Sequence, residues 1–436
     1  MGRRGAAGRM TGPRWAAGPS VPRPADPAMP EPNPAARPSP DPDADGLLAG
    51  TVHCIPREAL TDRLDRGERL RIKWGIDPSA PDIHLGHTVP MRLLRRWQER
   101  GHRPVVIIGD VTARIGDPSG RSATRTQLSG SEVEGNARTY LEQLYCILDP
   151  AEVEVRRQSE WFGDFRLEAM LRLASSVTVA QLLQREDFAN RMRLEHPIGI
   201  HELFYPLLQG HDSVAVAADV ELGGTDQLFN LLLGRELQAA AGQPPQAVVT
   251  VPLLVGLDGE RKMSKSLGNA VAVRAPAFEQ YGQLMSLPDR AVGAYLELVT
   301  DVPPARRAVL LAGMDDGSVN PRDVKAEMAD AVVTTFHGAE LAARAGAEFE
   351  RVHRAGHVPE VVADAPVLTG APQDLRRVLV AAGLATSLGE AARLITQGGV
   401  SLDGERVGDW RVPVAPAVGA VLRVGPRRFA RLVAGT

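Results

Sequence analysis

Short apolar runs and helical spacings alternate in the first part of the chain. Residues 71–76 (RIKWGI) and 104–110 (PVVIIGD) are short and apolar, as buried strands are. Between them, apolar residues at spacings of three and four predict a helix with Pro90 in its first turn and Gly101 at its carboxyl end. These apolar positions are Val89, Leu93, Leu94 and Trp97. Strand, helix and strand in this order predict a parallel sheet, with a nucleotide-type crevice at the carboxyl ends of its strands.

Two more strands are predicted further along the chain. The sequence is mostly helical up to about residue 210, and apolar runs then follow at 218–224 (ADVELGG) and 247–254 (AVVTVPLL). A helix over 226–241 lies between these two runs. Because strands continue to alternate with helices, we expect an α/β fold with a Rossmann-like parallel sheet for this part of the chain.

The sequence pattern changes twice in the second half of the chain. After residue 269 the pattern is helical again, and its clearest helix has Asn320 as N-cap, Pro321 at the first position and Gly338 at its end. Segment 356–372, which contains VPEVVADAPVLTGAP, interrupts the helical pattern and is predicted to be a linker. We therefore expect a separate helical domain over 271–355 and a third unit after the linker.

The third unit, residues 373–436, is short and basic. Apolar positions at helical spacing predict two amphipathic helices, and VSLDGERV predicts a hairpin with Asp403 and Gly404 at its turn. The helical positions are Leu375, Val378 and Leu379, then Ala391, Leu394 and Ile395. Arginines accompany both helices and crowd the end of the chain, namely Arg376, Arg377, Arg393, Arg423, Arg427, Arg428 and Arg431.

Composition narrows the class of protein. A chain of 436 residues suits two or three domains, and 44% hydrophobic with 24% charged residues is ordinary for a globular protein. Residues 1–45 are rich in Pro, Ala and Arg but poor in aliphatic side chains, so we predict a disordered extension. No run approaches the roughly 20 apolar residues of a membrane span. Two cysteines without metal-ligand spacing, Cys54 and Cys146, favour a reducing cytoplasm.

A histidine pair marks the turn between the first predicted strand and its helix. The sequence HLGH (84–87) stands where a helix N-terminus offers unpaired N–H groups to a polyanion. Gly86 lets a ligand approach the backbone, and His84 and His87 can donate hydrogen bonds to phosphates. The helix end disfavours charged imidazoles and a bound triphosphate favours them, so their charge stays open. The entry to the turn is shaped by Asp77, Pro78 and Ser79, the last with a hydroxyl that can donate to the same phosphates.

A second motif, KMSKS (262–266), follows the last predicted strand. Lys262 and Lys265 can neutralise charge that develops on a triphosphate, and Gly259 and Gly268 flank the segment and let it move. A basic segment of this kind is, by itself, more typical of a solvated loop. In this order after HLGH on an α/β chain, it indicates nucleotide chemistry instead.

HLGH followed by KMSKS resembles the class I aminoacyl-tRNA synthetases, and the resemblance covers nearly everything from about residue 47 onward. It implies that ATP and an amino acid condense to an aminoacyl adenylate, with Mg²⁺ and loss of pyrophosphate, before transfer to tRNA. ATP is then a substrate, and neither a prosthetic group nor a metal-ligating residue is implied. The residues implied in ATP binding are Gly75, Asp77, His84, Gly86, His87, Gly224, Asp226 and Lys265. The residues implied in catalysis are His84, His87, Lys262, Lys265 and Ser79.

Three further segments are similar to the tyrosyl-tRNA synthetases: GDPSG (116–120), then Tyr205, Gln209 and Asp212, then GGTDQ (223–227). Asp117, Tyr205 and Gln209 are suitable acceptors for the ammonium group of a free amino acid. Asp212 lies about one helical turn from Gln209, so the two face one side of a helix. The resemblance implies that Asp212 accepts the phenolic hydroxyl of L-tyrosine, that Gln227 lies near its carboxylate, and that Gly224 and Asp226 hold the adenylate ribose.

Lys73 departs from this pattern. Many tyrosyl enzymes have a tyrosine before the GxDP turn at this place, where it helps to hold the phenolic oxygen. Lys73 is therefore a candidate tyrosine-binding residue, and three arrangements stay open: it donates to the phenol, it pairs with Asp212, or it faces solvent. The literal KMSKS and the HELFYPL segment are similar to the second bacterial subgroup of tyrosyl enzymes.

Basic residues complete the candidate site. Arg121 and Arg125 follow GDPSG, and the resemblance implies that they assist pyrophosphate departure, although solvated arginines fit the sequence equally well. The net charge of the chain is −3, so any contact with RNA requires a local basic face. The third unit resembles the S4 RNA-binding fold, and Arg376, Arg377, Arg393 and Arg427 are its candidate RNA-binding residues.

These features predict three domains and an adenylating enzyme. We expect a Rossmann-like catalytic domain over 46–270 with a helical insertion, the helical domain, and an S4-like α+β RNA-binding domain over 373–436. The expected partners are tRNA(Tyr), L-tyrosine and ATP, together with a second copy of the chain bound through the helical insertion. Tryptophanyl-tRNA synthetase is the nearest alternative, and a non-catalytic RNA-binding protein that uses the S4 unit is another.

Overall fold

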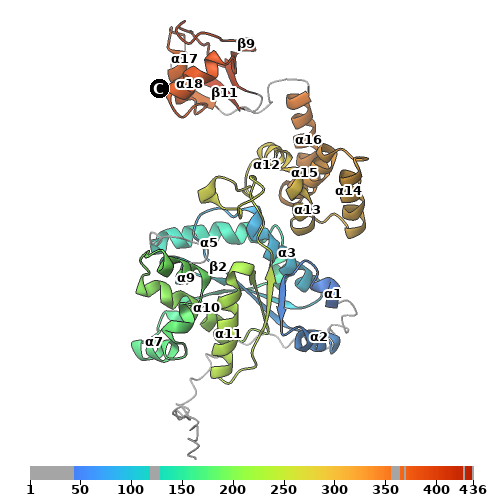
Figure 1. Cartoon of the computed structure of the whole chain (residues 1–436), viewed down its shortest axis with the longest axis vertical. Helices are drawn as coiled ribbons and strands as arrows, with labels where there is room; N and C mark the ends of the chain where they lie inside the picture. Colours follow the sequence, from blue (N-terminus) through green and yellow to red (C-terminus); the bar gives the residue numbers. More distant parts are fainter. Residues whose placement is uncertain (1–43, 118–127, 355–363, 368–369, 426–427, 435–436) are drawn as a thin grey trace, which may run out of the picture.

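The computed structural model describes residues 44–117, 128–354, 364–367, 370–425 and 428–434. Most of the predicted N-terminal extension, together with Arg121, Arg125 and Arg427, lies outside these residues. Figure 1 shows three parts in chain order: an α/β domain, a helical domain and a small C-terminal domain.

A six-stranded sheet with the order β1-β6-β5-β2-β3-β4 forms the centre of the first domain. Its strands are β1 His53–Ile55, β2 Arg71–Ile76, β3 Arg103–Ile108, β4 Glu154–Arg157, β5 Val220–Gly224 and β6 Ala247–Val251. β1 runs antiparallel to β6, and the other pairings are parallel. The chain leaves β2 toward β3 on one side and returns through β5 on the other, which makes the β2–β5 junction the topological switch point.

Helices cover both faces of this sheet (Figure 1). On one face, α3 (Leu85–Glu99) buries the predicted apolar stripe against alternate residues of β2 and β3, in a cluster that includes Leu93, Trp97 and Ile72. On the other face, α10 (Ile200–Val216) and α11 (Leu228–Ala240) pack together, and Val216 contacts Val105 and Ile107 of β3. Apolar residues on both sides are the pattern of a buried parallel sheet.

The remaining helices of this domain surround the sheet and form the insertion. They are α1 Ala44–Leu47, α2 Arg57–Asp65, α4 Thr112–Ile115, α5 Gly130–Leu144, α6 Ser159–Phe162, α7 Leu167–Ala174, α8 Val179–Leu182 and α9 Glu186–Arg193, with 3₁₀ turns at Pro150–Glu152, Thr225–Gln227 and Lys265–Leu267. None of the helices in the described part of the chain is long and apolar enough to cross a membrane.

One expectation for this domain is corrected, and one strand lies within a stretch that is predicted to be mostly helical. Pro90 lies in the second turn of α3, since the helix begins at Leu85, and no proline occupies its first turn. The segment between α5 and α10 is mostly helical, as expected, but it includes β4, which extends the sheet beside β3. β4 has the sequence EVRR, so it lacks the apolar run by which an interior strand is predicted. The carboxyl-terminal glycine of α3 is as expected, with Gly101 at φ +81° after the cap residue Arg100.

The helical domain contains five helices in its described residues: α12 Ala277–Met285, α13 Asp289–Leu298, α14 Pro304–Asp316, α15 Pro321–His337 and α16 Ala339–Arg354. The predicted start of α15 is confirmed, because the Asn320 side chain accepts a hydrogen bond from Arg322 N and Pro321 follows it. Gly338 ends this helix, also as predicted.

The C-terminal domain has its own core and a five-stranded sheet in the order β7-β11-β10-β8-β9. Its elements are β7 Asp364–Val367, α17 Leu375–Ala381, α18 Leu388–Thr396, β8 Val400–Leu402, β9 Glu405–Arg406, β10 Val421–Val424 and β11 Arg428–Ala434. Asp403 and Gly404 both have positive φ, which confirms the predicted hairpin turn.

One strand of this sheet comes from the segment predicted to be a linker. β7 pairs in parallel with β11, and its side chains alternate between exposed and buried, with Ala365 and Val367 inside. Pro366 is tolerated there because β7 is an edge strand and proline cannot donate to a ladder. Residues 364–367 therefore belong to the C-terminal domain.

Candidate active site

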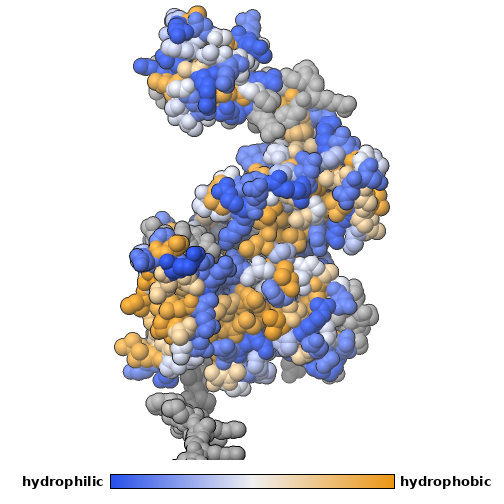
Figure 2. Space-filling model, viewed as in Figure 1, coloured by the Kyte–Doolittle hydropathy of each residue, from blue (hydrophilic) through white to orange (hydrophobic). Residues whose placement is uncertain are grey.

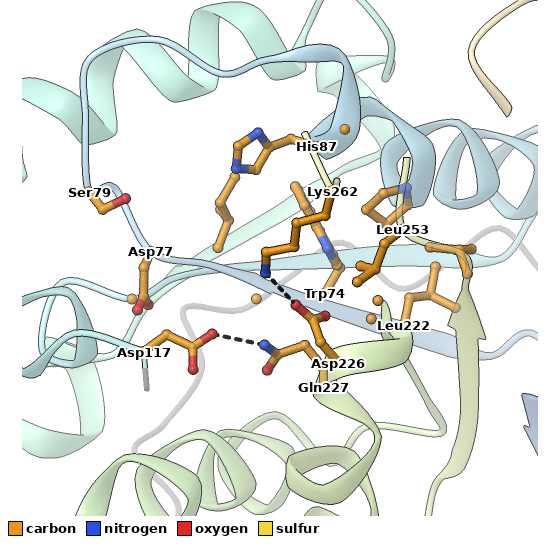
Figure 3. Close-up of a pocket in the computed structure, with 18 of the residues that line it drawn as sticks. Trp74, Asp77, Ser79, His87, Asp117, Leu222, Asp226, Gln227, Leu253 and Lys262 are labelled. Atoms are coloured by element: carbon orange, nitrogen blue, oxygen red, sulfur yellow. Dashed lines mark hydrogen bonds and ion pairs between the residues drawn. The ribbon is translucent and has the colours of Figure 1, made fainter. Parts of the chain in front are cut away.

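A pocket of about 820 Å³ opens at the carboxyl ends of β2 and β5, where the chain order reverses. Gly75 and Asp77 enter it from β2, Gly224 from β5, and the HLGH and KMSKS motifs close one side (Figure 3). The predicted residues that line it are Gly75, Asp77, Ser79, His84, Gly86, His87, Asp117, Tyr205, Gln209, Asp212, Gly224, Asp226, Gln227 and Lys262. The sheet thus brings nearly all of the predicted site together from segments far apart in the sequence.

The two histidines are neutral imidazoles at the pocket wall. Burial and the neighbouring positive charges lower the pKa of His84 to about 2 and that of His87 to about 4. Their ring centroids are 4.0 Å apart. His87 Nδ1 accepts a hydrogen bond from the backbone N of His84 at 3.2 Å, so the proton of the neutral His87 ring is on Nε2. His87 is therefore a donor through Nε2.

The N-terminus of α3 differs from the expectation of unpaired N–H groups. Leu85 N donates to the carbonyl of Val271, and Gly86 N donates to Met263 Sδ at 3.4 Å. Both acceptors come from the KMSKS loop and the strand-like segment after it, which the sequence does not place beside this helix. A side chain at position 86 would meet the His84 ring at 3.0 Å, so the close approach here is between protein atoms.

The KMSKS loop is tied at its base. The Asp258 carboxylate accepts from the backbone of Glu260 and Arg261 and from Asn269 Nδ2, and these hydrogen bonds hold the pKa of Asp258 far below its usual range. Asn269 Oδ1 in turn accepts from Ser264 N at 2.8 Å. Gly259 and Gly268 adopt positive φ on the two sides of the motif, a conformation that favours glycine.

The two lysines of this loop take different positions. Lys262 lines the pocket, and its Nζ lies 3.1 Å from Asp226 Oδ2 (Figure 3). Lys265 is not among the lining residues, and its ammonium group donates to the carbonyl of Asp82. Burial lowers the pKa of Lys265.

Opposite the histidines, a chain of amide and carboxylate groups lines the pocket. Gln227 Nε2 donates to Asp117 Oδ2 at 2.8 Å, as Figure 3 shows. Asn230 Nδ2 donates to Gln227 Oε1 at 3.0 Å and to Gln209 Oε1 at 2.8 Å. Arg185, from the helical insertion, reaches this row of hydrogen-bonded side chains, and its Nη2 lies 3.8 Å from Asp117 Oδ1. The oxygens of Asp117 and Gln209 are thereby held as acceptors.

Tyr205 and Asp77 connect these hydrogen-bonded side chains to the turn before HLGH. Tyr205 Oη donates to Asp77 Oδ2 at 3.0 Å, and Thr112 Oγ1 donates to Asp77 Oδ1 at 2.7 Å. With its proton committed to Asp77, the Tyr205 hydroxyl can meet a ligand as an acceptor. Gly109 makes room for this contact, since a Cβ there would stand 2.1 Å from Asp77 Oδ1.

Asp212 lies deeper in the pocket as a buried carboxyl group. Gln158 Nε2 donates to its Oδ2 at 2.8 Å, and Trp161 Nε1 donates to its Oδ1 at 3.1 Å. Burial raises the pKa of Asp212 to about 7, partly opposed by the nearby charge of Lys73 and by these two hydrogen bonds. Because Asp212 is a buried carboxyl group that also lines the pocket, it is suited to accept a hydrogen bond from a ligand hydroxyl.

Lys73 does not adopt any of the three expected arrangements. Its side chain is fully buried outside the pocket lining, and Nζ donates to Glu221 Oε1 at 2.8 Å and to Ser213 Oγ at 2.9 Å. No ion pair with Asp212 forms. Glu221 takes the place of Asp212 as partner because it stands directly opposite Lys73 in the pairing of β2 with β5.

Several residues that build the site carry no sequence signal of their own. Gln158 and Trp161 follow β4, the charged edge strand that was not predicted, so their position at the carboxyl edge of the sheet was hidden. Thr112, Asn230 and Arg185 contact the site only through tertiary packing. Among the described residues, no cluster of three or more His, Cys, Asp or Glu side chains is arranged to hold a metal ion.

The candidate RNA-binding arginines of the C-terminal domain are not equivalent. Arg377 and Arg393 are exposed on α17 and α18. Arg376 instead pairs with Asp374 at 2.6 Å and stacks over Trp410, with 3.7 Å between the guanidinium carbon and the ring centroid.

The chain matches two family models and several curated proteins. Residues 65–354 match the model for tRNA synthetases class I (W and Y), and residues 375–416 match the S4 domain. The tyrosine–tRNA ligase of Moorella thermoacetica is 49% identical over 393 residues, which cover 88% of this chain and 94% of that protein. The Thermotoga maritima tyrosine–tRNA ligase is 47% identical over 390 residues, with 89% and 96% covered.

Solved structures share the fold at lower identity. The tyrosyl-tRNA synthetase from Archaeoglobus fulgidus, complexed with L-tyrosine, has a TM-score of 0.57 and 22% identity, and covers 69% of this chain and 97% of that one. The Plasmodium falciparum tryptophanyl-tRNA synthetase has a TM-score of 0.52 and 14% identity, with 67% and 80% covered. The fold is thus shared between the two kinds of enzyme, whereas the relatives of high identity are tyrosine–tRNA ligases. The chain belongs to the tyrosyl-tRNA synthetase family of class I aminoacyl-tRNA synthetases.

Proposed function

We propose that the pocket at the β2–β5 junction carries out both steps of tyrosine–tRNA ligation with the residues described above. The observation that carries this assignment is the buried carboxyl group of Asp212 at one end of a pocket whose other end is formed by HLGH and Lys262. One end suits a phenol and the other suits a triphosphate.

L-Tyrosine binds along the polar chain from Asp117 to Asp212. Its ammonium group is held by Asp117, Tyr205 and Gln209, and Gln227 lies near its carboxylate. Its phenolic hydroxyl donates to Asp212, whose two oxygens are oriented by Gln158 and Trp161. Phenylalanine would leave this buried acceptor without its donor, a discrimination for which tyrosyl-tRNA synthetases are themselves the standard example.

ATP, with Mg²⁺ bound to its phosphates, lies between HLGH and the KMSKS loop. His87 donates through Nε2 to the phosphates, and Ser79 and His84 line the same wall. Gly224 and Asp226 contact the ribose. Asp226 pairs with Lys262 in this structure, and nucleotide that contacts Asp226 through its ribose frees the lysine to reach the phosphates. Lys265 moves from Asp82 in the same step.

In the first step, the tyrosine carboxylate attacks the α-phosphorus of ATP and the bond to pyrophosphate breaks. The two lysines stabilise the charge that develops on the leaving group, because they reach it fully only in the closed loop. We assign Arg121 and Arg125, which lie outside the described residues, to the same leaving group.

In the second step, a ribose hydroxyl of the 3′-terminal adenosine of tRNA(Tyr) attacks the carbonyl of the adenylate, and AMP leaves. Positioning drives this step more than a strong base does, since the acyl phosphate anhydride is already reactive. The S4 domain holds the tRNA through Arg377 and Arg393, which are exposed on one helix pair, with Arg427 in support. Arg376 contributes to RNA binding through its stacking on Trp410 as well as through its charge.

The helical insertion binds a second copy of the chain. Figure 2 shows apolar surface over α7 and α9, and large apolar side chains are exposed there, among them Leu167 at 72% and Ile200 at 75%. The other members of this surface are Leu171, Val179, Met192 and Leu194. An apolar patch of this kind on a globular protein marks an interface. The homodimer works in the cytoplasm, in keeping with the free thiols of Cys54 and Cys146.

Amino-acid-dependent ATP–pyrophosphate exchange tests this function. The purified chain is assayed with tyrosine, tryptophan and phenylalanine in separate reactions. We expect exchange with tyrosine and little with the other two. Exchange that tryptophan stimulates and tyrosine does not would overturn the assignment of the pocket.

A further inference from the structure

A buried ion pair stands beside the amino-acid end of the pocket and takes no part in the chemistry described above. Lys73 of β2 and Glu221 of β5 are partners in the pairing of two parallel strands, and 2.8 Å separates Nζ from Oε1. Their side chains are 0% and 1% exposed, and the Gln246 side chain donates to the second oxygen of Glu221. A buried pair is a weak source of stability because two charges must leave water, so its presence calls for another role.

The Lys73–Glu221 pair forms hydrogen bonds with one turn of α10. Besides Glu221, Lys73 Nζ donates to the carbonyl oxygen of Gln209 and to Ser213 Oγ, each at 2.9 Å. Ser213 Oγ then donates to Glu221 Oε2 at 3.0 Å. These contacts use all three protons of the ammonium group. The turn from Gln209 to Ser213 carries Asp212, so the pair holds the Gln209 backbone and the Ser213 side chain on either side of the carboxyl group that faces the substrate.

The pair also sets the charge around Asp212. Burial is the main cause that raises the pKa of Asp212 to about 7; the charge of Lys73 lowers it and the charge of Glu221 raises it. His211, the neighbour on α10, is neutral at pH 7 because burial lowers its pKa to about 4. Without Lys73, two carboxyl groups would share a buried region, and such a pair retains a proton at neutral pH.

We propose that the Lys73–Glu221 pair is a specificity-determining element for tyrosine, which acts by positioning the Gln209–Ser213 turn and by keeping Asp212 a hydrogen-bond acceptor. The inference rests on the proposed function, because it requires that Asp212 accept the phenolic hydroxyl. Lys73 is a positioning residue, since it reaches the substrate only through α10.

Opposite charge changes on the two partners test this role. The variants are Lys73→Met, Glu221→Gln and the double variant, with kcat/KM for tyrosine measured across pH by pyrophosphate exchange. Lys73→Met moves the midpoint of the pH profile upward by on the order of one pH unit, and Glu221→Gln moves it downward. The double variant returns toward the wild type. At pH 7 the tyrosine-over-phenylalanine ratio falls roughly fivefold in Lys73→Met, because the ionised fraction of Asp212 falls with the upward move.

Controls separate this role from simple damage. Lys325→Met removes a lysine from another ion pair, with Asp289 at 2.5 Å in the helical domain, and leaves both the midpoint and the ratio unchanged. The KM for ATP stays the same in all variants. If Lys73→Met does not fold, Glu221→Gln and the double variant still give the downward move and its reversal.

The possible outcomes separate the inference from the proposed function. Midpoints that stay at the wild-type value, or that move in the same direction in Lys73→Met and Glu221→Gln, overturn the inference. Asp212→Asn is measured in parallel. If Asp212→Asn reduces the tyrosine-over-phenylalanine ratio and the Lys73 and Glu221 variants do not, only the inference fails. If Asp212→Asn leaves the ratio unchanged, the assigned role of the pocket fails with it.

Discussion

The hydroxyl of Tyr205 donates a hydrogen bond to Asp77 at 3.0 Å, and this contact joins the two halves of the active site. Tyr205 belongs to α10, which lines the amino-acid end, whereas Asp77 follows β2 on the way to HLGH. Tyr205, which we propose to bind the ammonium of tyrosine, is therefore coupled to the turn that leads to His84 and His87, which we propose to bind phosphates.

Gly109 is predicted to be essential to this contact. A Cβ at position 109 would stand 2.1 Å from Asp77 Oδ1 and 2.5 Å from Thr112 Oγ1, so Gly109→Ala must displace Asp77. We expect a rise in KM for tyrosine and a loss of stability of about 1–3 kcal/mol. Steady-state pyrophosphate exchange and thermal denaturation measure the two effects. Gly135→Ala on α5, where a Cβ meets nothing within 4 Å, is the matched control, and an unchanged KM in Gly109→Ala would count against the coupling.

Lys262 is predicted to act on the transition state rather than on tyrosine binding. Its ammonium group pairs with Asp226 in this structure, and we propose that it moves to the departing pyrophosphate when nucleotide binds. Lys262→Ala should lower the rate of adenylate formation by roughly 10²–10³-fold with little change in KM for tyrosine. Rapid-quench measurement of adenylate formation gives this rate, and Lys325→Ala serves as the control. A variant that loses tyrosine affinity at an unchanged rate would place Lys262 in the wrong part of the pocket.

The parts of the catalytic centre that are formed by residues close together in the sequence could be predicted from it. HLGH stands between a short apolar run and a periodic apolar stripe, and both features are read directly from neighbouring residues. β2, β3, β5 and β6 are interior strands with apolar runs, so they were predicted close to their observed bounds. Pocket residues in recognisable short segments, such as Asp117 and Gln227, could be predicted for the same reason.

The rest depends on which distant segments become neighbours. β4 is an edge strand with charged side chains, so neither it nor the Gln158 and Trp161 that follow it gave a pattern. The partner of Lys73 is Glu221 because β2 and β5 are adjacent at the switch point, and strand order is not encoded in either strand alone. The N–H groups of Leu85 and Gly86 are occupied for the same kind of reason, by segments that follow much later in the chain.

The histidine pair is predicted to make the protein less stable in acid when no ATP is present. The folded-state pKa of His87 is about 4, below the ordinary value of 6.5, because burial disfavours its charged form. Between these two values the unfolded chain binds a proton that the folded chain does not, so stability falls as pH falls below 6.5. His84, with a pKa of about 2, acts in the same direction.

His87→Gln removes the titration of that residue while its amide can still donate a hydrogen bond. The contribution of His87 amounts to at most about 2 kcal/mol at pH 5. The decrease in Tm between pH 7.5 and pH 5 should be smaller in His87→Gln than in the wild type. Thermal denaturation without ATP measures this difference. An equal decrease in Tm in both proteins would mean that His87 is charged in the folded enzyme.

The central claim is that the buried carboxyl group of Asp212 selects tyrosine. Asp212→Asn keeps the shape of the side chain but removes the charged acceptor that Gln158 and Trp161 orient. Asp330→Asn, which removes another carboxyl group with a pKa raised by burial but outside the pocket, is the control.

The most direct measurement is the ratio of kcat/KM for tyrosine to that for phenylalanine, by pyrophosphate exchange, in wild type, Asp212→Asn and Asp330→Asn. A charged hydrogen bond of about 1.5–3 kcal/mol predicts that the ratio falls by roughly 10–100-fold in Asp212→Asn alone. A ratio that stays at the wild-type value in Asp212→Asn would contradict the account.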